Sequence, residues 1–275
     1  MYQGFYNLAS GMLTQGRNLN VISNNMVNVQ TPGYKHDTMV SSTFQEEMLY
    51  RTGRHNKENP TPLATTSKIK AADQTYVNYD QGSFEMTDGI YDFALGGKGF
   101  FRIQAADGER YTRNGNFSVD QEGYLVLNDQ GRVLSADGNP IRIDNENFTV
   151  DGQGHITAAI TTGGSIYEED GGDGAETETE IRDYGTIGVV DFADYGQLHK
   201  EDNGLFSTDQ APIELGTEDN PAPPIQWKYL EKSNVDMVDE MTAMMSSQRA
   251  LQSAAQVLKM YDQIMSKSVS DVGRL

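Results

Sequence analysis

The last stretch of the chain carries a pattern that strongly limits how the protein can fold. An apolar residue recurs at every seventh position, six times in succession, and neither proline nor glycine interrupts the stretch before Gly273. A heptad repeat of this length predicts one long amphipathic helix whose apolar seam packs against another helix. The residues of this C-terminal seam are Met237, Met244, Leu251, Leu258, Met265 and Val272.

The residues just before this seam predict where the helix starts. Ser233, Asn234 and Asp236 precede the first seam residue. A serine side chain can accept hydrogen bonds from the free N–H groups of a first turn, and an aspartate suits the positive end of a helix. We therefore expect Ser233 to act as the acceptor and Asp236 to complement the helix dipole.

A second heptad series opens the chain. Its members are Phe5, Met12, Leu19 and Met26. This N-terminal seam predicts a helix that ends at Thr31-Pro32-Gly33, because proline lacks an N–H, restricts the residue before it, and is followed here by a flexible glycine. Residues 1–34 and 231–275 are thus predicted to form one helical, coiled-coil domain.

These helices need partners, because a helix with one apolar face gains too little from its own hydrogen bonds to stay folded in water. Two interpretations are open: the helices pair within one chain, or they pair and also pack against neighbouring subunits. The second is favoured by apolar or small residues that lie off the C-terminal seam, namely Met241, Met245, Ala254, Ala255 and Val269. If these are buried in an assembly, they form a second contact face.

The middle of the chain changes to a period of two, with turn signals between short runs of strand-forming residues. Examples are the runs 100–103 and 124–127 and the turn dipeptides Asp107-Gly108 and Asn114-Gly115. This pattern predicts an all-β body over residues 76–230. Residues 35–75 contain Pro60 and Pro62 and are predicted to be an extended linker, polar and irregular over 35–70. The fold class is therefore α+β, with terminal helices bracketing a central β body.

Charge is distributed unevenly over these regions. The formal net charge is −19, but residues 1–70 carry +3, residues 228–275 carry 0, and the middle carries −22. The basic density that phosphate binding needs is absent, so a nucleic-acid partner is not expected. The absence of cysteine excludes disulfides and thiolate metal sites. No apolar run is long enough for a membrane span or resembles a secretory signal, so we expect no membrane insertion and a dedicated route for any export.

Catalytic chemistry finds little support in the sequence. His36, His55, His155 and His199 have no partner at metal-ligand or general-base spacing, and we expect them at the surface. An acidic insert near residues 163–180 has oxygen ligands that could bind calcium loosely, but it lacks the twelve-residue loop pattern. We expect no catalytic residues, no metal site and no cofactor. The alternative from another class is a secreted β-scaffold glycan-binding protein or enzyme.

Several motifs resemble the bacterial flagellar rod and hook proteins. The N-terminal signature runs from Asn24 to Lys35 and is preceded by Ser10-Gly11-Met12. A central stretch, 81–101 followed by 111–117, and the closing stretches 230–236 and 248–250 are also similar. The chain departs from the family pattern at three positions. Lys228 stands where glycine is usual, Val27 where alanine is common, and Ala254 where asparagine is frequent.

The resemblance implies a non-enzymatic subunit of an axial tube, with terminal helices inside and β domains outside. It implies copies of the same chain, neighbouring rod or hook subunits and the flagellar type III export apparatus as partners, and a place in the basal body outside the cytoplasm. A rod subunit that transmits torque is the leading interpretation, and a hook subunit is the alternative. The assembly motif that follows is Asn24, Asn25, Asn28, Thr31, Pro32, Gly33 and Tyr34.

The signature also has a physical interpretation of its own. Asn25 and Asn28 are three residues apart on the expected last helical turn, so both could reach one neighbouring backbone segment and fix the helix exit. A purely local helix cap is the alternative, and the two can coexist.

Overall fold

The computed structural model describes residues 2–51, 61–128, 130–161, 179–201, 203–216 and 220–272. The chain divides into two units. The helical unit comprises Met1–Val29, Lys35–Tyr79 and Val235–Leu275, and the β unit comprises Gln30–Tyr34 and Asp80–Asn234. The predicted linker therefore belongs to the helical unit, whereas residues 30–34 and 231–234 belong to the β unit.

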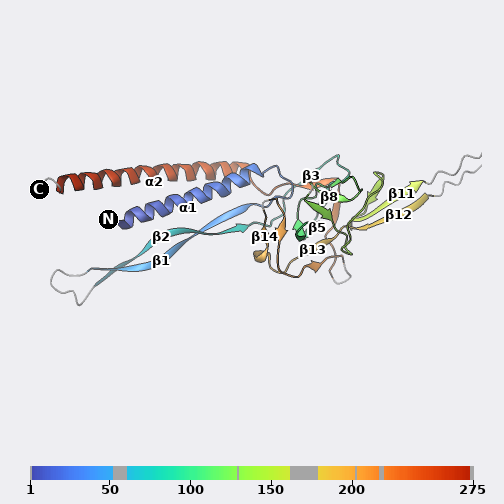
Figure 1. Cartoon of the computed structure of the whole chain (residues 1–275), viewed down its shortest axis with the longest axis horizontal. Coiled ribbons are helices and arrows are strands. Elements are labelled where there is room, and N and C mark those ends of the chain that lie inside the picture. Colours follow the sequence, from blue (N-terminus) through green and yellow to red (C-terminus); the bar gives the residue numbers. More distant parts are fainter. Residues whose placement is uncertain are drawn as a thin grey trace, which may run out of the picture. The chain divides into compact units, whose positions relative to one another are not determined.

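Two helices form the main part of the helical unit. Helix α1 spans Tyr2–Val27 and helix α2 spans Met237–Val272. They lie side by side and run in opposite directions, so the N- and C-termini meet at the same end of the pair (Figure 1). Both predicted helices are confirmed, but α1 ends before Thr31, where the sequence had indicated the stop. The supercoiling of the pair stays a prediction.

The region predicted to be irregular is a long β-hairpin. Strand β1 (Asp37–Arg51) pairs antiparallel with β2 (Thr61–Val77), and both contact α1. The prediction of an irregular connection was wrong over the described residues, because these segments pair as strands and Pro62 falls where a hairpin tolerates it. Pro62 lies opposite Tyr50, next to a shift in the strand register, and irregular positions of this kind can accept a residue that lacks an N–H. Pro60 is outside the described residues.

Short antiparallel strands build the β unit. In its described part, the largest sheet has the order β14-β15-β6-β5-β9-β8-β7, with β13 paired to β5 and β16 paired to β13, and a second sheet has the order β10-β11-β12. The pairs β17-β4 and β18-β3 complete it. The bounds are β3 Phe84–Met86, β4 Phe93–Leu95, β5 Phe100–Ala105, β6 Gly108–Thr112, β7 Ser118–Val119, β8 Leu125–Leu127, β9 Gly131–Val133, β10 Phe148–Val150, β11 His155–Thr161, β12 Thr179–Thr186, β13 Val189–Asp191, β14 His199–Lys200, β15 Phe206–Ser207, β16 Ile213–Glu214, β17 Ile225–Trp227 and β18 Tyr229–Glu231, with a 3-10 turn at Tyr195–Gln197.

A single apolar core joins these sheets. The buried residues come from most of the strands, and Phe101 lies edge-on to Phe117 at 5.3 Å between ring centres. The core residues are Phe93, Leu95, Phe101, Ile103, Phe117, Leu125, Leu127, Val133, Ile141, Ile143, Phe148, Ile156, Ala158, Ile187, Val189, Leu205 and Ile225. The predicted α+β class with a central β body is confirmed. The acidic insert lies almost entirely outside the described residues.

Lys228 adopts a backbone conformation that lysine rarely takes. Its φ is +64°, between β17 and β18, where its N–H donates to Asp92 O at 2.8 Å and its carbonyl accepts from Thr87 N at 2.8 Å. Left-handed backbone favours glycine, because a Cβ crowds the neighbouring carbonyl. This geometry explains why a glycine would suit the position.

Candidate assembly site

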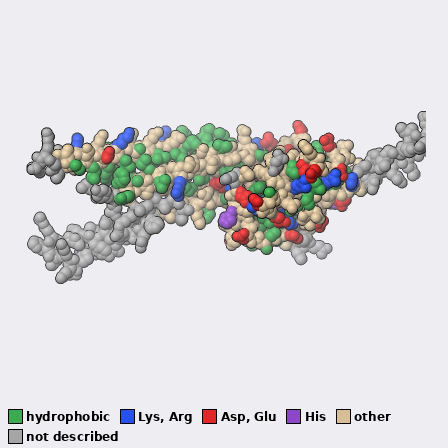
Figure 2. Space-filling view, in the orientation of Figure 1, with side chains coloured by type: hydrophobic (Ala, Val, Ile, Leu, Met, Phe, Trp, Pro, Cys, Tyr) green, Lys and Arg blue, Asp and Glu red, His purple; other side chains and the backbone are tan. Residues whose placement is uncertain are grey.

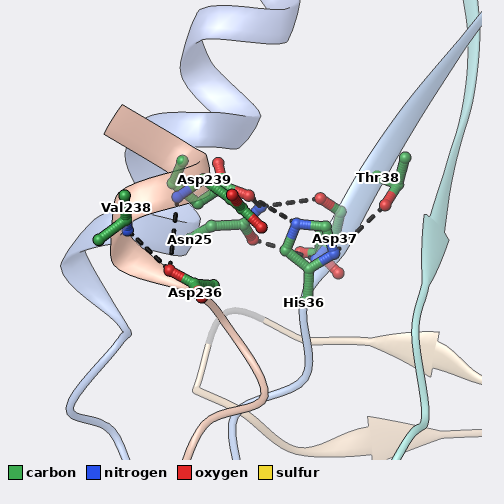
Figure 3. Close-up of polar contacts among 8 residues, drawn as sticks. Asn25, His36, Asp37, Thr38, Asp236, Val238 and Asp239 are labelled. Atoms are coloured by element: carbon green, nitrogen blue, oxygen red, sulfur yellow. Dashed lines mark hydrogen bonds and ion pairs between the residues drawn. The ribbon is translucent and has the colours of Figure 1, made fainter. Parts of the chain in front are cut away.

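The side chain of Asn25 joins the end of α1 to the start of β1. Its Nδ2 donates to the carbonyl oxygen of Asp37 at 2.8 Å, and its Oδ1 accepts from the Asp37 N–H at 3.0 Å (Figure 3). Asn25 is only 1% exposed. An amide side chain can satisfy both backbone groups of one residue at once, so Asn25 fixes the direction in which the chain enters the hairpin.

Glu240, in the first turns of α2, extends this network. Its Oε1 lies 2.6 Å from His36 Nε2 and 3.4 Å from Asn25 Nδ2. Glu240 is 7% exposed, so these two contacts supply polar partners to a carboxyl group that has little access to water. Nearby in the same unit, burial and, secondarily, the charge of Asp37 raise the pKa of Tyr79, which keeps its phenol protonated. One polar network therefore ties α1, β1 and α2 together.

Asp236 caps the start of α2. Its Oδ1 accepts from the backbone N–H of Val238 at 2.8 Å and of Asp239 at 3.4 Å (Figure 3). The prediction of Ser233 as this acceptor was wrong, because the helix starts at Met237, too far along the chain for Ser233 to be its cap. Asn234 lies in the β unit, where its Nδ2 donates to Asp80 O at 2.9 Å.

Polar residues mark the contact between the helices. Asn18 Nδ2 donates to Ser247 Oγ at 3.1 Å, one heptad away from the pairing of Asn25 with Glu240 in both helices. Thr14, Ile22, Asn25, Glu240 and Ser247 are the buried residues of the two helices. The contact between α1 and α2 in a single chain is therefore rich in small and polar side chains.

The predicted seam residues are less buried than these five residues. Phe5 and Met237 are exposed. Most of the remaining seam residues are half-buried, namely Met12, Leu19, Met26, Met244, Leu251, Leu258 and Met265, and the side chain of Val272 lies outside the described part. The two seams are therefore only partly covered within one chain.

Large apolar side chains line the outside of the helix pair. Met241 is 45% and Met245 is 52% exposed. Apolar side chains gather along the helices in Figure 2, whereas acidic side chains gather on the β unit. The other exposed apolar residues of α2 are Val238, Val257, Met260, Tyr261, Ile264 and Val269, while Ala254 and Ala255 are half-buried.

The assembly motif is divided between the units. In the helical unit Asn24 is exposed, and Asn28 Nδ2 donates to Asn24 O at 2.8 Å within its own turn. Asn28 thus caps its own turn, because α1 ends at Val27 and its terminal carbonyls need a donor. That Asn25 and Asn28 together fix the helix exit by reaching one backbone segment stays a prediction.

The rest of the motif, Thr31 to Tyr34, belongs to the β unit. Gly33 N–H donates to Glu231 O at 2.7 Å, and Gly33 has a φ of +68°. A Cβ at Gly33 would lie 2.4 Å from the carbonyl carbon of Arg113, so no other residue fits. Tyr34 is buried, with Lys200 Nζ 3.7 Å from the centre of its ring.

Sequence reasoning missed three members of the site: His36, Asp37 and Glu240. His36 was expected at the surface without a partner, yet it contacts Glu240. His155 also has a partner, Asp183, at 2.9 Å, although both are well exposed. A usable signal for the helix contact was the seven-residue spacing of Asn18 from Asn25 and of Glu240 from Ser247.

Within the described residues, no three His, Asp or Glu side chains gather closely enough to hold a metal ion. In the same part of the chain, neither helix is long and apolar enough to cross a membrane.

Three segments match families of flagellar proteins. Residues 5–35 match the family described as Flagella basal body rod protein, and residues 94–158 match Flagellar hook protein FlgE/F/G D1 domain. Residues 227–271 match Flagellar basal body rod FlgEFG protein C-terminal. Together with a β unit placed between two paired terminal helices, these matches define the class: a structural protein of the flagellar rod and hook type.

Full-length relatives identify the family within this class. The chain is 30% identical to the flagellar basal-body rod protein FlgG of Bacillus subtilis over 98% of this chain and 99% of the relative. It is 31% identical to the rod protein FlgF of Caulobacter vibrioides over 97% and 96%. It is also 29% identical to the hook-basal body complex protein FlhO of Bacillus subtilis over the full length of both.

The chain belongs to the family of flagellar basal-body rod proteins. It is a structural subunit of the rod, located in the basal body of the bacterial flagellum. The hook subunit is not favoured, because the FlgG and FlgF relatives, which cover nearly the whole chain, carry rod names.

Proposed function

We propose that the helical unit is the polymerising part of this rod subunit. In this proposal, the α1–α2 pair of each copy packs against those of neighbouring copies and of other rod or hook subunits. The packed helices form the inner layer of the axial tube that transmits torque towards the hook, and the β units face outward. The observation that carries the proposal is the row of exposed apolar side chains on α2, beginning with Val238, Met241 and Met245.

Burial of this row would supply the driving force. Each large aliphatic side chain stabilises an interface by about 1.5–3 kcal/mol when it is moved fully out of water. A half-exposed methionine is already partly removed from water, so its burial in an interface contributes less than this full amount. Several side chains must therefore be buried together to stabilise the interface. Electrostatics support packing at the helices rather than at the β body, since residues 228–275 carry no net charge while the middle of the chain carries −22.

Export by the flagellar type III apparatus completes the proposal. A subunit that assembles at the distal end of a growing tube has to travel through it before polymerising. The polar contact at Asn18 and Asn25 is compatible with helices that separate for export and pair again afterwards, because polar contacts are satisfied by water in the separated state.

The test is a pair of double variants in a motile strain. Met241→Asp with Met245→Asp places two charges on the exposed row. We expect this variant to fold but to be missing from isolated basal bodies, with loss of motility. The matched control is Ser246→Asp with Gln248→Asp, which adds the same charge at exposed polar positions of the same helix segment.

The control should be incorporated at more than about half the normal level. Normal incorporation of the methionine variant would refute the proposal that this row is buried between subunits. Circular dichroism of both purified variants checks that a loss of incorporation is not a loss of folding.

A further inference from the structure

A buried ion pair lies in the β unit where the chain passes to and from the helical unit. Glu231 Oε2 lies 3.2 Å from Arg113 Nη1, and the two residues are 1% and 5% exposed. Arg113 also lies over the ring of Phe100, 5.4 Å from its centre. A buried charge is tolerated only when it is paired and hydrogen-bonded, so each partner requires the other.

Three segments of the β unit lead directly to the helical unit: residues 30–34, residues 80–83 and residues 231–234. Every covalent connection between the two units runs through one of them. Glu231 bonds both other segments, since its backbone oxygen accepts from Gly33 N–H at 2.7 Å and its Oε1 accepts from Gly82 N–H at 3.0 Å.

Further backbone bonds hold the same segments together. Lys232 N–H donates to Ser83 O at 2.8 Å, and Asn234 N–H donates to Tyr34 O at 3.4 Å. The contact is too close for a side chain, because a Cβ at Gly82 would lie 1.9 Å from Lys232 O. The three segments therefore form one tightly packed block.

We infer that Glu231 and Arg113 form a clamp that fastens these three segments to the β core, so that they open together rather than one at a time. Arg113 follows β6 of the main sheet, and Glu231 holds the segments to it. Both are positioning residues, because they contact the connecting segments. In the rod, the clamp would pass force between the units, a consequence that rests on the proposed function.

The experiment is native-state hydrogen exchange on the purified full-length chain in low concentrations of denaturant. For the wild type we expect the amides of Gly33, Gly82 and Lys232 to exchange through one shared opening, with the same denaturant dependence. This measurement needs no variant, so it tests the inference even if a substitution prevents folding. Separate openings of the three amides would overturn it.

Two substitutions sharpen the test. Glu231→Gln keeps the shape but removes the charge, and Arg113→Met removes the partner. We expect either change to speed exchange at all three amides together, by about tenfold to a hundredfold, as for loss of a buried charged hydrogen bond. The exchange rates of core amides, such as that of Ile103, should change far less.

The matched control is Glu85→Gln. It breaks an exposed ion pair with Lys232 of 3.0 Å in the same region and should leave the three amides within about twofold of the wild type. Faster exchange confined to Gly82, the direct partner of the Glu231 carboxylate, would mean a local contact and would contradict the clamp. Because the measurement uses the isolated chain, its failure is separate from failure of the proposed role in rod assembly.

Discussion

The helical unit and the β unit bury opposite kinds of residue. The β unit closes around phenylalanine and branched aliphatic side chains, whereas the described part of the helix pair buries Thr14, Ile22, Asn25, Glu240 and Ser247 and leaves Met241 and Met245 exposed. A unit with a closed apolar core can be stable on its own. A helix pair that buries several polar residues and exposes large apolar side chains has hydrophobic stabilisation still to gain.

This difference predicts that the β unit survives loss of α2. Deletion of residues 235–275 removes the C-terminal part of the helical unit but keeps Glu231 and Asn234 in the β unit. We expect the β unit to retain a cooperative thermal transition, while α1 loses its helix signal and the cells lose motility. Circular dichroism and swimming assays measure these effects. Loss of all cooperative unfolding in the truncated chain would contradict the independence of the β unit.

Within the β core, Phe101→Ala should have the next largest effect. Phe101 is fully buried against Phe117, and such a truncation lowers the free energy of unfolding by about 3–5 kcal/mol. We expect chemical denaturation to show that the β unit unfolds at a lower denaturant concentration, while the unfolding transition of the helices is unchanged. An equal shift of both transitions would mean that the two units unfold as one.

In the helical unit, Asn25→Ala should destabilise by roughly 2–3 kcal/mol, because it leaves the N–H and carbonyl of Asp37 without their amide partner. Asn28→Ala is the matched control, since the Asn28 side chain donates to a carbonyl of its own turn and its loss should cost no more than about 0.5–1 kcal/mol. Equal effects of the two substitutions on the helix transition would argue against the role given to Asn25.

Lys228→Gly should give the smallest change in the free energy of unfolding, and this change should be stabilising rather than destabilising. Relief of the φ of +64° should stabilise the β unit by about 0.5–1 kcal/mol. The gain is reduced because Lys228 Nζ lies 4.6 Å from the centre of the Trp227 ring. Lys228→Ala loses that contact without relieving the backbone, and so serves as the control. A stabilising Lys228→Ala would show that the backbone is not the cause.

The sequence allowed more to be predicted of the β unit than of the helical unit. The run Phe100–Ile103 lies in β5, and Asp107-Gly108 makes the turn into β6 with a φ of +125° at the glycine. These features follow from local alternation and turn chemistry. The sequence of β1 and β2 does not show the apolar alternation of a half-buried strand. Its polar composition therefore predicts a linker rather than a hairpin.

Contacts between distant residues could not be predicted. Asn25 meets Asp37, and Glu231 meets Arg113, through the packing of whole segments rather than through any local pattern. The heptads predicted the helices correctly, but periodicity alone cannot say which partner covers an apolar seam. In this chain Asn25, Glu240 and Ser247 are buried, whereas Met241 and Met245 are exposed.

The most direct test of the central claim is the solvent accessibility of α2 in assembled rods. The natural chain has no cysteine, so Met245→Cys provides a single reactive thiol on the exposed row. We predict that a maleimide labels it rapidly in the purified chain and at least about tenfold more slowly in intact basal bodies. Equal labelling rates in the two states would contradict the claim that rod assembly buries the outer face of α2.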